Sequence, residues 1–341
     1  MRIPTRRGLV PAAVAFAAVL ATANIVTAQA DAATTAATVA HPASCGGPVT
    51  VTTPASGTLT AADEGAYASA LDVSAASPLL RRAQATHARW LTTLDCKAEP
   101  GHTHLLSSGA EKAAADKATA DTVDQSEDGA GYVAADSSAN TVWSEWTVPT
   151  VTDTPDVTED KYSSIWPGIG ADNGAGELLQ DGTEQDYLCA QASGGTCAEP
   201  EVSYYFWLQM YPAEDEETVG NLNASPGDSV ATEVVYTASS AAVEFLMCDY
   251  TENSCVEGTQ TTPAAPEGTV EWILGSDLPL ADFGTATLTD NGVDDATHTN
   301  VGPATVGAAV ANMYDSSGKE LASTGSIDSS DEFTVGWLNA S

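Results

Sequence analysis

Two short segments carry the side chains best suited to chemistry. ELLQDGTEQDY, residues 177–187, places Gln180 among carboxylates, and TVEWILG, residues 269–275, places Glu271 in an apolar run. The chain has 47 Asp and Glu residues but five histidines, and His298 is the only histidine after residue 104. Proton transfer would therefore fall to carboxylates working at acid pH. They would act either as a pair, as in glycoside hydrolysis, or as one carboxylate with a neutral hydrogen-bonding partner.

The same residues exclude several classes of enzyme. A Ser-His-Asp or Cys-His arrangement needs a histidine to carry the proton, and His298 lies in the loop-like DDATHTN with no G-x-S-x-G nearby. The Asp-Thr-Gly and Asp-Ser-Gly tripeptides expected of paired-aspartate proteases do not occur in the sequence. GADNGAG lacks a following helix pattern, so nucleotide binding is not indicated.

Strands are the elements expected to position these side chains, because apolar residues alternate with a period of two from residue 131 onward. Examples are TVWSEWTVP, SYYFWLQMYP, SVATEVVYT, TVEWILG and EFTVGWL. No amphipathic helix pattern interrupts the series, and DNG at 290–292 and DSSGK at 315–319 are typical of hairpin turns. The pattern predicts an all-β fold, an antiparallel β-sandwich that forms one large domain over residues 125–341.

A longer series of motifs resembles the glutamic peptidases, the eqolisin or G1 family, over most of residues 125–338. The series comprises AGYV at 130–133, SEWTVP at 144–149, YSSIWPGIGADNGAGELLQDGTEQDY at 162–187, YYFWLQMYP at 204–212, GTVEWILGSDLPLADFG at 268–284 and ANMYDSSGKELASTGSIDSSDEFTVGW at 311–337. The resemblance implies a concanavalin A-like sandwich of two curved antiparallel sheets, with a substrate cleft on the concave sheet.

The resemblance also assigns roles to individual residues. Gln180 in LLQDG falls on the family's catalytic glutamine, and Glu271 in TVEWI falls on its catalytic glutamate. Trp166 and Trp207 match tryptophans that line the site, and we expect them to bind substrate. Gln209, which stands where a glutamate is frequent, is the third expected substrate-binding residue.

The resemblance implies an acid endopeptidase that resists pepstatin, and the protein is expected to be secreted. Ionised Glu271 would take a proton from water as the water attacks the scissile carbonyl, and would later give that proton to the leaving amine. Gln180 would hold the water and stabilise the oxyanion with an amide that never titrates. Gly170 replaces an aspartate and Gly129 a tryptophan that are common in the family, and both departures bear on substrate preference.

The first part of the chain predicts a precursor. Residues 1–30 have a basic leader, a short apolar run and an Ala-Gln-Ala site, as in a secretory signal peptide. Residues 31–124 are expected to be a propeptide and linker, with an amphipathic helix over 77–94. Arg81, Arg82 and Arg89 on that helix would attract the acidic domain. In the resembled family such segments inhibit and then leave, so the protein's own propeptide is an expected inhibitor.

Charge limits the possible partners. The net charge is −36, and from residue 122 onward Lys161 and Lys319 are the only lysines, with no arginine. Such a surface repels nucleic acid and anionic membranes, so neither is expected as a partner once the signal is removed. Crowded carboxylates predict a fold that is most stable at acid pH. The acidic run EDEE at 214–217 is interpreted as a solvated loop rather than a cation site.

The six cysteines predict disulfides rather than a metal centre. Cys189 with Cys197 and Cys248 with Cys255 would close short loops, which leaves Cys45 and Cys96 as a third pair. Thiolate zinc sites usually have C-x-x-C spacing and nearby histidines. We therefore expect no metal and no cofactor.

Two other functions remain open from the sequence. A non-catalytic, lectin-like sandwich could bind polysaccharide through its tryptophans, and an acid glycosidase would need a second carboxylate facing Glu271. The glutamine at position 180 argues against the glycosidase. The favoured interpretation is a monomer whose partners are protein or peptide substrates.

Overall fold

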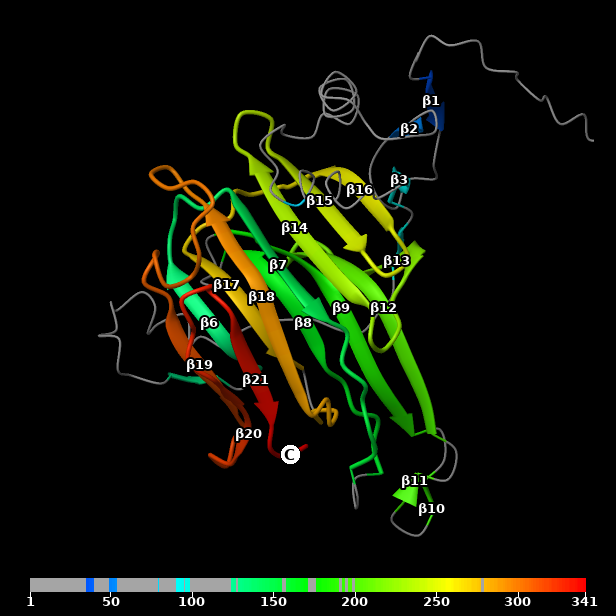
Figure 1. The fold of residues 1–341 in the computed structure, drawn as a ribbon, viewed down its shortest axis with the longest axis vertical. Coiled ribbons are helices and arrows are strands. Elements are labelled where there is room, and N and C mark those ends of the chain that lie inside the picture. The colour runs from blue at the N-terminus through cyan, green and yellow to red at the C-terminus, as the bar shows by residue number, and fades with distance from the viewer. Residues whose placement is uncertain are drawn as a thin grey trace, which may run out of the picture. The chain divides into compact units, whose positions relative to one another are not determined.

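A computed structural model describes this chain, and its described part is built almost wholly from strands (Figure 1). Every described residue belongs to one unit, Thr34–Ser341. The structure describes residues 35–39, 49–53, 79, 90–94, 96–98, 124–126, 128–154, 158–170, 176–189, 192–193, 196–197, 200–276 and 279–341. Among these residues no helix is long and apolar enough to cross a membrane.

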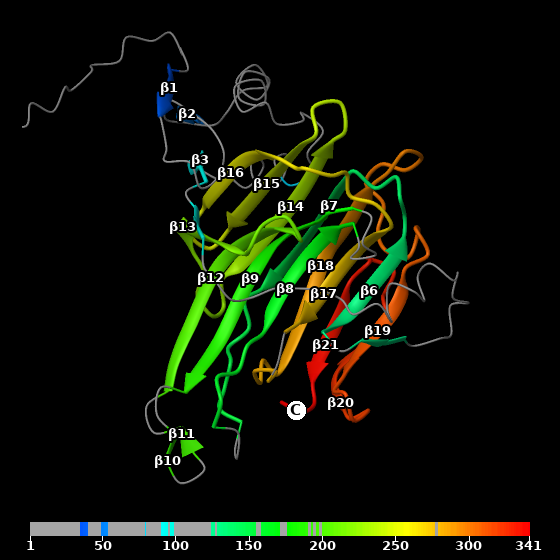
Figure 2. The ribbon, with the colours of Figure 1, turned by 180° about the vertical axis from the view of Figure 1, so that it is seen from behind.

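Fourteen antiparallel strands form two curved sheets, as the sequence predicted (Figures 1 and 2). Sheet one has the order β13 (Glu217–Asn223), β12 (Pro200–Tyr211), β9 (Leu178–Cys189), β8 (Ser164–Ile169), β17 (Thr269–Gly275), β6 (Gly129–Ala135), β19 (Ala309–Tyr314). Sheet two has the order β16 (Ser254–Thr261), β15 (Ala242–Asp249), β14 (Ser229–Thr237), β7 (Thr141–Thr147), β18 (Thr285–Asp294), β21 (Phe333–Trp337), β20 (Glu320–Thr324). Pairing of β19 with β20 joins the sheets along one side.

Alternation along each strand gives sheet one two different faces. In β17, Val270, Trp272 and Leu274 point into the main core between the sheets, so Glu271 and Ile273 point to the other face. Trp272 also donates from Nε1 to the backbone oxygen of Trp143 on sheet two, at 3.0 Å. Each large side chain buried in this core stabilises the sandwich by about 2–3 kcal/mol. The face opposite the core is called the site face below.

The predicted helix over 77–94 is wrong at its end. Leu79 is helical, but Trp90–Thr93 form β3, which pairs in parallel with β16, and Cys96–Ala98 form β4, which pairs antiparallel with β13. Leu94 between them is buried, and its N–H donates to the oxygen of Glu257 at 2.9 Å. The unpaired edges of both sheets offer backbone partners that outweigh the helical pattern. The three arginines of the predicted helix lie outside the described residues.

Shorter pairings complete the described part. β1 (Thr35–Val39) pairs with β2 (Val49–Thr53), β10 (Ala192–Ser193) pairs with β11 (Thr196–Cys197), and β5 (Asp124–Ser126) pairs in parallel with β19. The first two pairs are separate two-stranded sheets.

One of the two predicted hairpin turns is present. Residues 315–319 turn from β19 to β20, and the N–H of Asp315 donates to the backbone oxygen of Lys319. Gly318 in this turn has a φ of 85°. Residues 290–292 lie within β18 instead, at a register shift between Thr289 and Gly292. A Cβ at Gly292 would lie 1.9 Å from the ring of Trp143, so the glycine there serves close packing rather than a turn.

Two predicted disulfides are confirmed. Cys189 is bonded to Cys197, at the end of β9, and Cys248 is bonded to Cys255, across the β15–β16 pair. The predicted pairing of Cys96 with Cys45 lies outside the described residues.

Candidate active site

Four neighbouring strands bring the predicted catalytic residues into one row. Gln209 on β12 is paired with Gln180 on β9, Gln180 with Gly168 on β8, and Gly168 with Glu271 on β17. Side chains of directly paired residues project to the same face of an antiparallel sheet. Gln180 and Glu271 therefore share the site face, with their Cα atoms two strand spacings apart, about 10 Å.

Gly168 leaves the space between these two side chains open. A Cβ at this position would lie 3.2 Å from both Cγ and Oε1 of Glu271, and 3.3 Å from Cδ1 of Leu178. The Glu271 side chain thus leans over the glycine toward the strand of Gln180. Sequence reasoning did not single out Gly168, although a glycine inside the apolar strand SIWPGI could have signalled close approach of another group.

Glu271 is held by an indole. The residue is 1% exposed, and Trp166 Nε1 donates to its Oε1 at 2.9 Å. Trp166 meets Trp207 edge to face, with ring centroids 6.1 Å apart, and Trp207 Nε1 donates to Ser164 Oγ at 2.8 Å. Both tryptophans are fully buried and form a small apolar cluster with Val133 and Ile273. Trp166 therefore contacts Glu271 directly, whereas Trp207 supports Trp166.

Gln180 is held from the opposite side by a second amide. Its Nε2 donates to Gln209 Oε1 at 2.9 Å, and the two residues are 0% and 1% exposed. The amide–amide contact fixes the plane of the Gln180 side chain. Gln209 thus contacts the predicted catalytic glutamine itself.

The model of the Peptidase A4 family matches residues 127–337. This chain belongs to the Peptidase A4 family. Membership makes it a peptidase, with proteins or peptides as substrates, and agrees with the resemblance to glutamic peptidases seen in its motifs. No curated protein matches the chain significantly.

Three solved structures similar to this A4 family member are glutamic peptidases or an eqolisin. Scytalido-glutamic peptidase, with a transition state analog inhibitor, has 17% identity and a TM-score of 0.49, and the match covers 62% of this chain and 98% of that one. SCP-B, an Eqolisin family member with the tripeptide Ala-Ile-His, has 15% identity and a TM-score of 0.46, with the same coverage. Aspergilloglutamic peptidase from Aspergillus niger has 25% identity and a TM-score of 0.42, covering 52% and 99%.

The two family departures have different surroundings in this A4 peptidase. Gly170 has a φ of 104°, and a Cβ there would lie 2.0 Å from the backbone oxygen of Glu177. The backbone of this chain therefore has no room for an aspartate at position 170. Gly129 begins β6, opposite Gly275 of β17.

A group of buried acids lies farther along the site face of the A4 domain. Glu184 and Asp186 follow Gln180 at every second position of β9, and Glu216 lies just before β13. Burial raises the pKa of Asp186 to about 11, and the negative charge of Glu184 adds to the effect. Burial, with the charges of Glu184 and Glu216, also raises the pKa of Tyr205. The raised pKa keeps Asp186 protonated beside its acidic neighbours.

The predicted solvated loop at 214–217 is wrong for its second half. Glu216 and Glu217 are both buried. Glu216 lies near Tyr205 and the acids of the site face, and Glu217 lies at the edge of the sandwich. Gln260 Nε2 on β16 donates to Glu217 Oε2 at 3.2 Å and so ties the edges of the two sheets. Burial raises the pKa of Glu217 to about 7.

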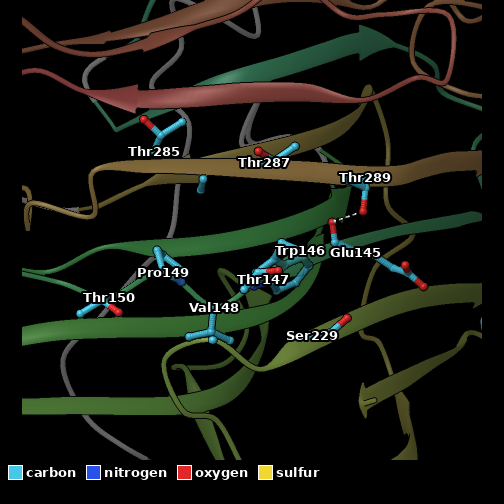
Figure 3. Close-up of a pocket in the computed structure, with 12 residues that line it drawn as sticks. Glu145, Trp146, Thr147, Val148, Pro149, Thr150, Ser229, Thr285, Thr287 and Thr289 are labelled. Atoms are coloured by element: carbon cyan, nitrogen blue, oxygen red, sulfur yellow. Dashed lines mark hydrogen bonds between the residues drawn. The ribbon is translucent and has the colours of Figure 1, made fainter. Parts of the chain in front are cut away.

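A separate groove of about 400 Å³ lies on the outer face of sheet two (Figure 3). Glu145 and Thr147 of β7, Ser229 of β14, and Thr285, Thr287 and Thr289 of β18 line it. The neighbours of these residues in sequence, such as Trp146 and Leu288, point into the main core. The groove is therefore on the far side of the sandwich from Gln180 and Glu271.

Proposed function

We propose that this A4 peptidase is an acid endopeptidase in which Glu271 is the general base and Gln180 stabilises the oxyanion. The observation that carries the proposal is the row of paired residues Gln180, Gly168 and Glu271 on one face. A carboxylate and an amide face each other there across a position that has no side chain.

The reaction proceeds in two steps. Glu271 takes a proton from a water molecule above Gly168 while the water oxygen bonds to the scissile carbonyl carbon. The carbonyl oxygen becomes negative and receives a hydrogen bond from the Gln180 amide, a contribution of about 3 kcal/mol. Glu271 then gives its proton to the amide nitrogen as the C–N bond breaks, which releases a carboxylic acid and an amine.

Trp166 prepares Glu271 for this role. Its N–H binds Oε1 and so favours the ionised carboxylate, the form that can take a proton from water. The indole and the Gln180 amide do not titrate in acid, so the donors of the site persist at low pH. The carboxylate alone sets the lower pH limit of the reaction.

The chain is proposed to be secreted as a precursor, with residues 1–30 as signal peptide and residues 31–124 as an inhibitory segment. The six cysteines and the acidic composition support an exported, acid-adapted protein. Maturation at pH 3 that is no faster than at pH 7, without other proteases, would overturn acid activation. The family match favours a peptidase over the lectin-like and glycosidase alternatives.

The test is digestion of a denatured protein by purified precursor from pH 2 to 7, with and without pepstatin. We expect cleavage on the acid side that pepstatin does not inhibit. Gln180→Ala and Glu271→Ala should each abolish cleavage, and thermal unfolding should show that both variants remain folded. Full activity of either folded variant would refute the proposed roles.

A further inference from the structure

A hydrogen bond between two buried amides controls the orientation of Gln180. We propose that Gln209 is a positioning residue that turns the amide of Gln180 toward Glu271, rather than a residue that binds substrate. This inference rests on the proposed function of Gln180. Its basis is the 2.9 Å bond from Gln180 Nε2 to Gln209 Oε1.

The strand order gives this bond a direction. Gln209 lies on β12, on one side of Gln180, and Glu271 lies on β17, on the other side, beyond Gly168. Because Nε2 of Gln180 points toward β12, the amide oxygen is turned toward Gly168 and Glu271. The same NH2 group supplies the hydrogen bond that the proposed mechanism directs at the oxyanion.

An amide without this acceptor could rotate by half a turn. Oxygen and nitrogen would then exchange places, and the amide oxygen would face the developing negative charge. Both residues are buried, so water does not readily replace Gln209 as the hydrogen-bond acceptor. Gln209 therefore contributes to catalysis through the geometry of its neighbour, without touching the reacting atoms.

The neutral side chain at position 209 matters because this face is already rich in acids. Titratable groups on the site face around the row include Glu271 of β17, Glu184 and Asp186 of β9, Tyr205 and Tyr211 of β12, and Glu216 just before β13. A carboxylate at position 209 would accept the same hydrogen bond, but it would oppose the oxyanion and change its own charge with pH. Gln209 holds Gln180 equally at pH 3 and pH 7.

The experiment measures kcat and KM from pH 2 to 7 for Gln209→Leu and Gln209→Glu. Gln209→Leu should lower kcat by about 10- to 100-fold with little change in KM, because orientation is lost while substrate contacts remain. Gln209→Glu should retain near wild-type kcat where the new carboxyl is protonated and lose it as that group ionises. Thermal unfolding of Gln209→Glu at each pH separates this loss from destabilisation: a kcat loss in the folded variant supports the inference, and a loss that only follows unfolding overturns it.

Gln185→Leu is the matched control. Gln185 is a buried glutamine on the same strand as Gln180, it faces the core, and its Nε2 donates to Thr183 Oγ1 at 2.6 Å. Its replacement should affect stability and leave kcat unchanged. If Gln209→Leu does not fold, the pH profile of Gln209→Glu decides the question alone.

Three outcomes separate this inference from the proposed function. In the background of Gln180→Ala, Gln209→Leu should have no further effect on any residual rate, since the two residues act as a unit. A Gln209→Leu variant with normal kcat and raised KM would overturn the inference in favour of substrate binding. If Gln180→Ala is itself fully active, the proposed function fails first.

Discussion

The site face of sheet one and the outer face of sheet two are made by the same alternation of side chains, yet they differ in chemistry. On sheet one, an amide, a carboxylate and two indoles from four strands lie on one face, and all of these side chains are buried. On sheet two, hydroxyl groups line a groove, with Thr147, Thr285 and Thr287 exposed (Figure 3). The difference shows that reactive geometry depends on which side chains share a row, and a groove alone does not provide it.

The largest contrast should come from matched carboxamide substitutions on the two faces. Glu271→Gln removes the proposed base, so kcat should fall by about 10³-fold or more. Glu145→Gln, in the groove of sheet two, should leave kcat unchanged. Peptide hydrolysis at acid pH measures both, and equal losses in the two variants would contradict the assignment of the site to sheet one.

A smaller effect is expected from filling the gap between Gln180 and Glu271. In Gly168→Ala the new methyl group lies 3.2 Å from Glu271 Oε1, so the carboxylate must move. We expect kcat to fall by about 100-fold.

Gly336→Ala on sheet two is the control for Gly168→Ala. A Cβ there meets only Ser323 Oγ, at 3.8 Å, so activity and thermal stability should stay near those of the wild type. A Gly168→Ala variant with wild-type kcat would show that the open space is not needed.

The pH dependence of stability should also differ between buried and exposed acids. The pKa of Asp186 is raised from 3.8 to about 11, so its contribution to stability is complete below about pH 4 and is lost as pH rises toward the folded value. Glu217, with a pKa raised to about 7, acts in the same direction. The wild type should therefore unfold at lower temperature at pH 7 than at pH 4.

Between pH 4 and pH 7 the free energy of unfolding should fall less in Asp186→Asn than in the wild type. The difference should be about 1.4 kcal/mol or more, the equivalent of one pKa unit. The control is Asp315→Asn, since hydrogen bonds from Ser317 and Lys319 lower the pKa of Asp315, which lies in a surface turn. The contribution of Asp315 to stability is lost only as pH falls. The change in the free energy of unfolding of Asp315→Asn between pH 4 and pH 7 should therefore match that of the wild type. Parallel declines in wild type and Asp186→Asn would argue against the buried acids as the cause.

The smallest effect should come from the hydroxyl row of sheet two. Thr287→Val keeps a branched side chain on an exposed strand position, so the free energy of unfolding should change by no more than about 0.5 kcal/mol. Acid peptidase activity should be unaffected. A marked loss of activity would show that the two faces are coupled.

Sequence reasoning predicted the sandwich because period-two patterns report which side chains face the core, and it singled out Gln180 and Glu271 only through the family resemblance of their motifs. It could not predict the register that places Gly168 between them, since pairing depends on distant strands. The helix prediction failed at Trp90–Thr93 because a helical pattern does not reveal an open sheet edge. Glu216 was misjudged because a run of acids looks solvated until its neighbours are known.

The strands β3 and β4 give the N-terminal segment a second importance. They cover β16 and β13, the outermost long strands of the two sheets, and Leu94 between β3 and β4 is buried against β16. An uncovered edge strand presents backbone groups to which another copy of the chain can add. Removal of residues 90–98 therefore leaves both edge strands unpaired. The trimmed enzyme should self-associate, and its light scattering should increase as its concentration rises.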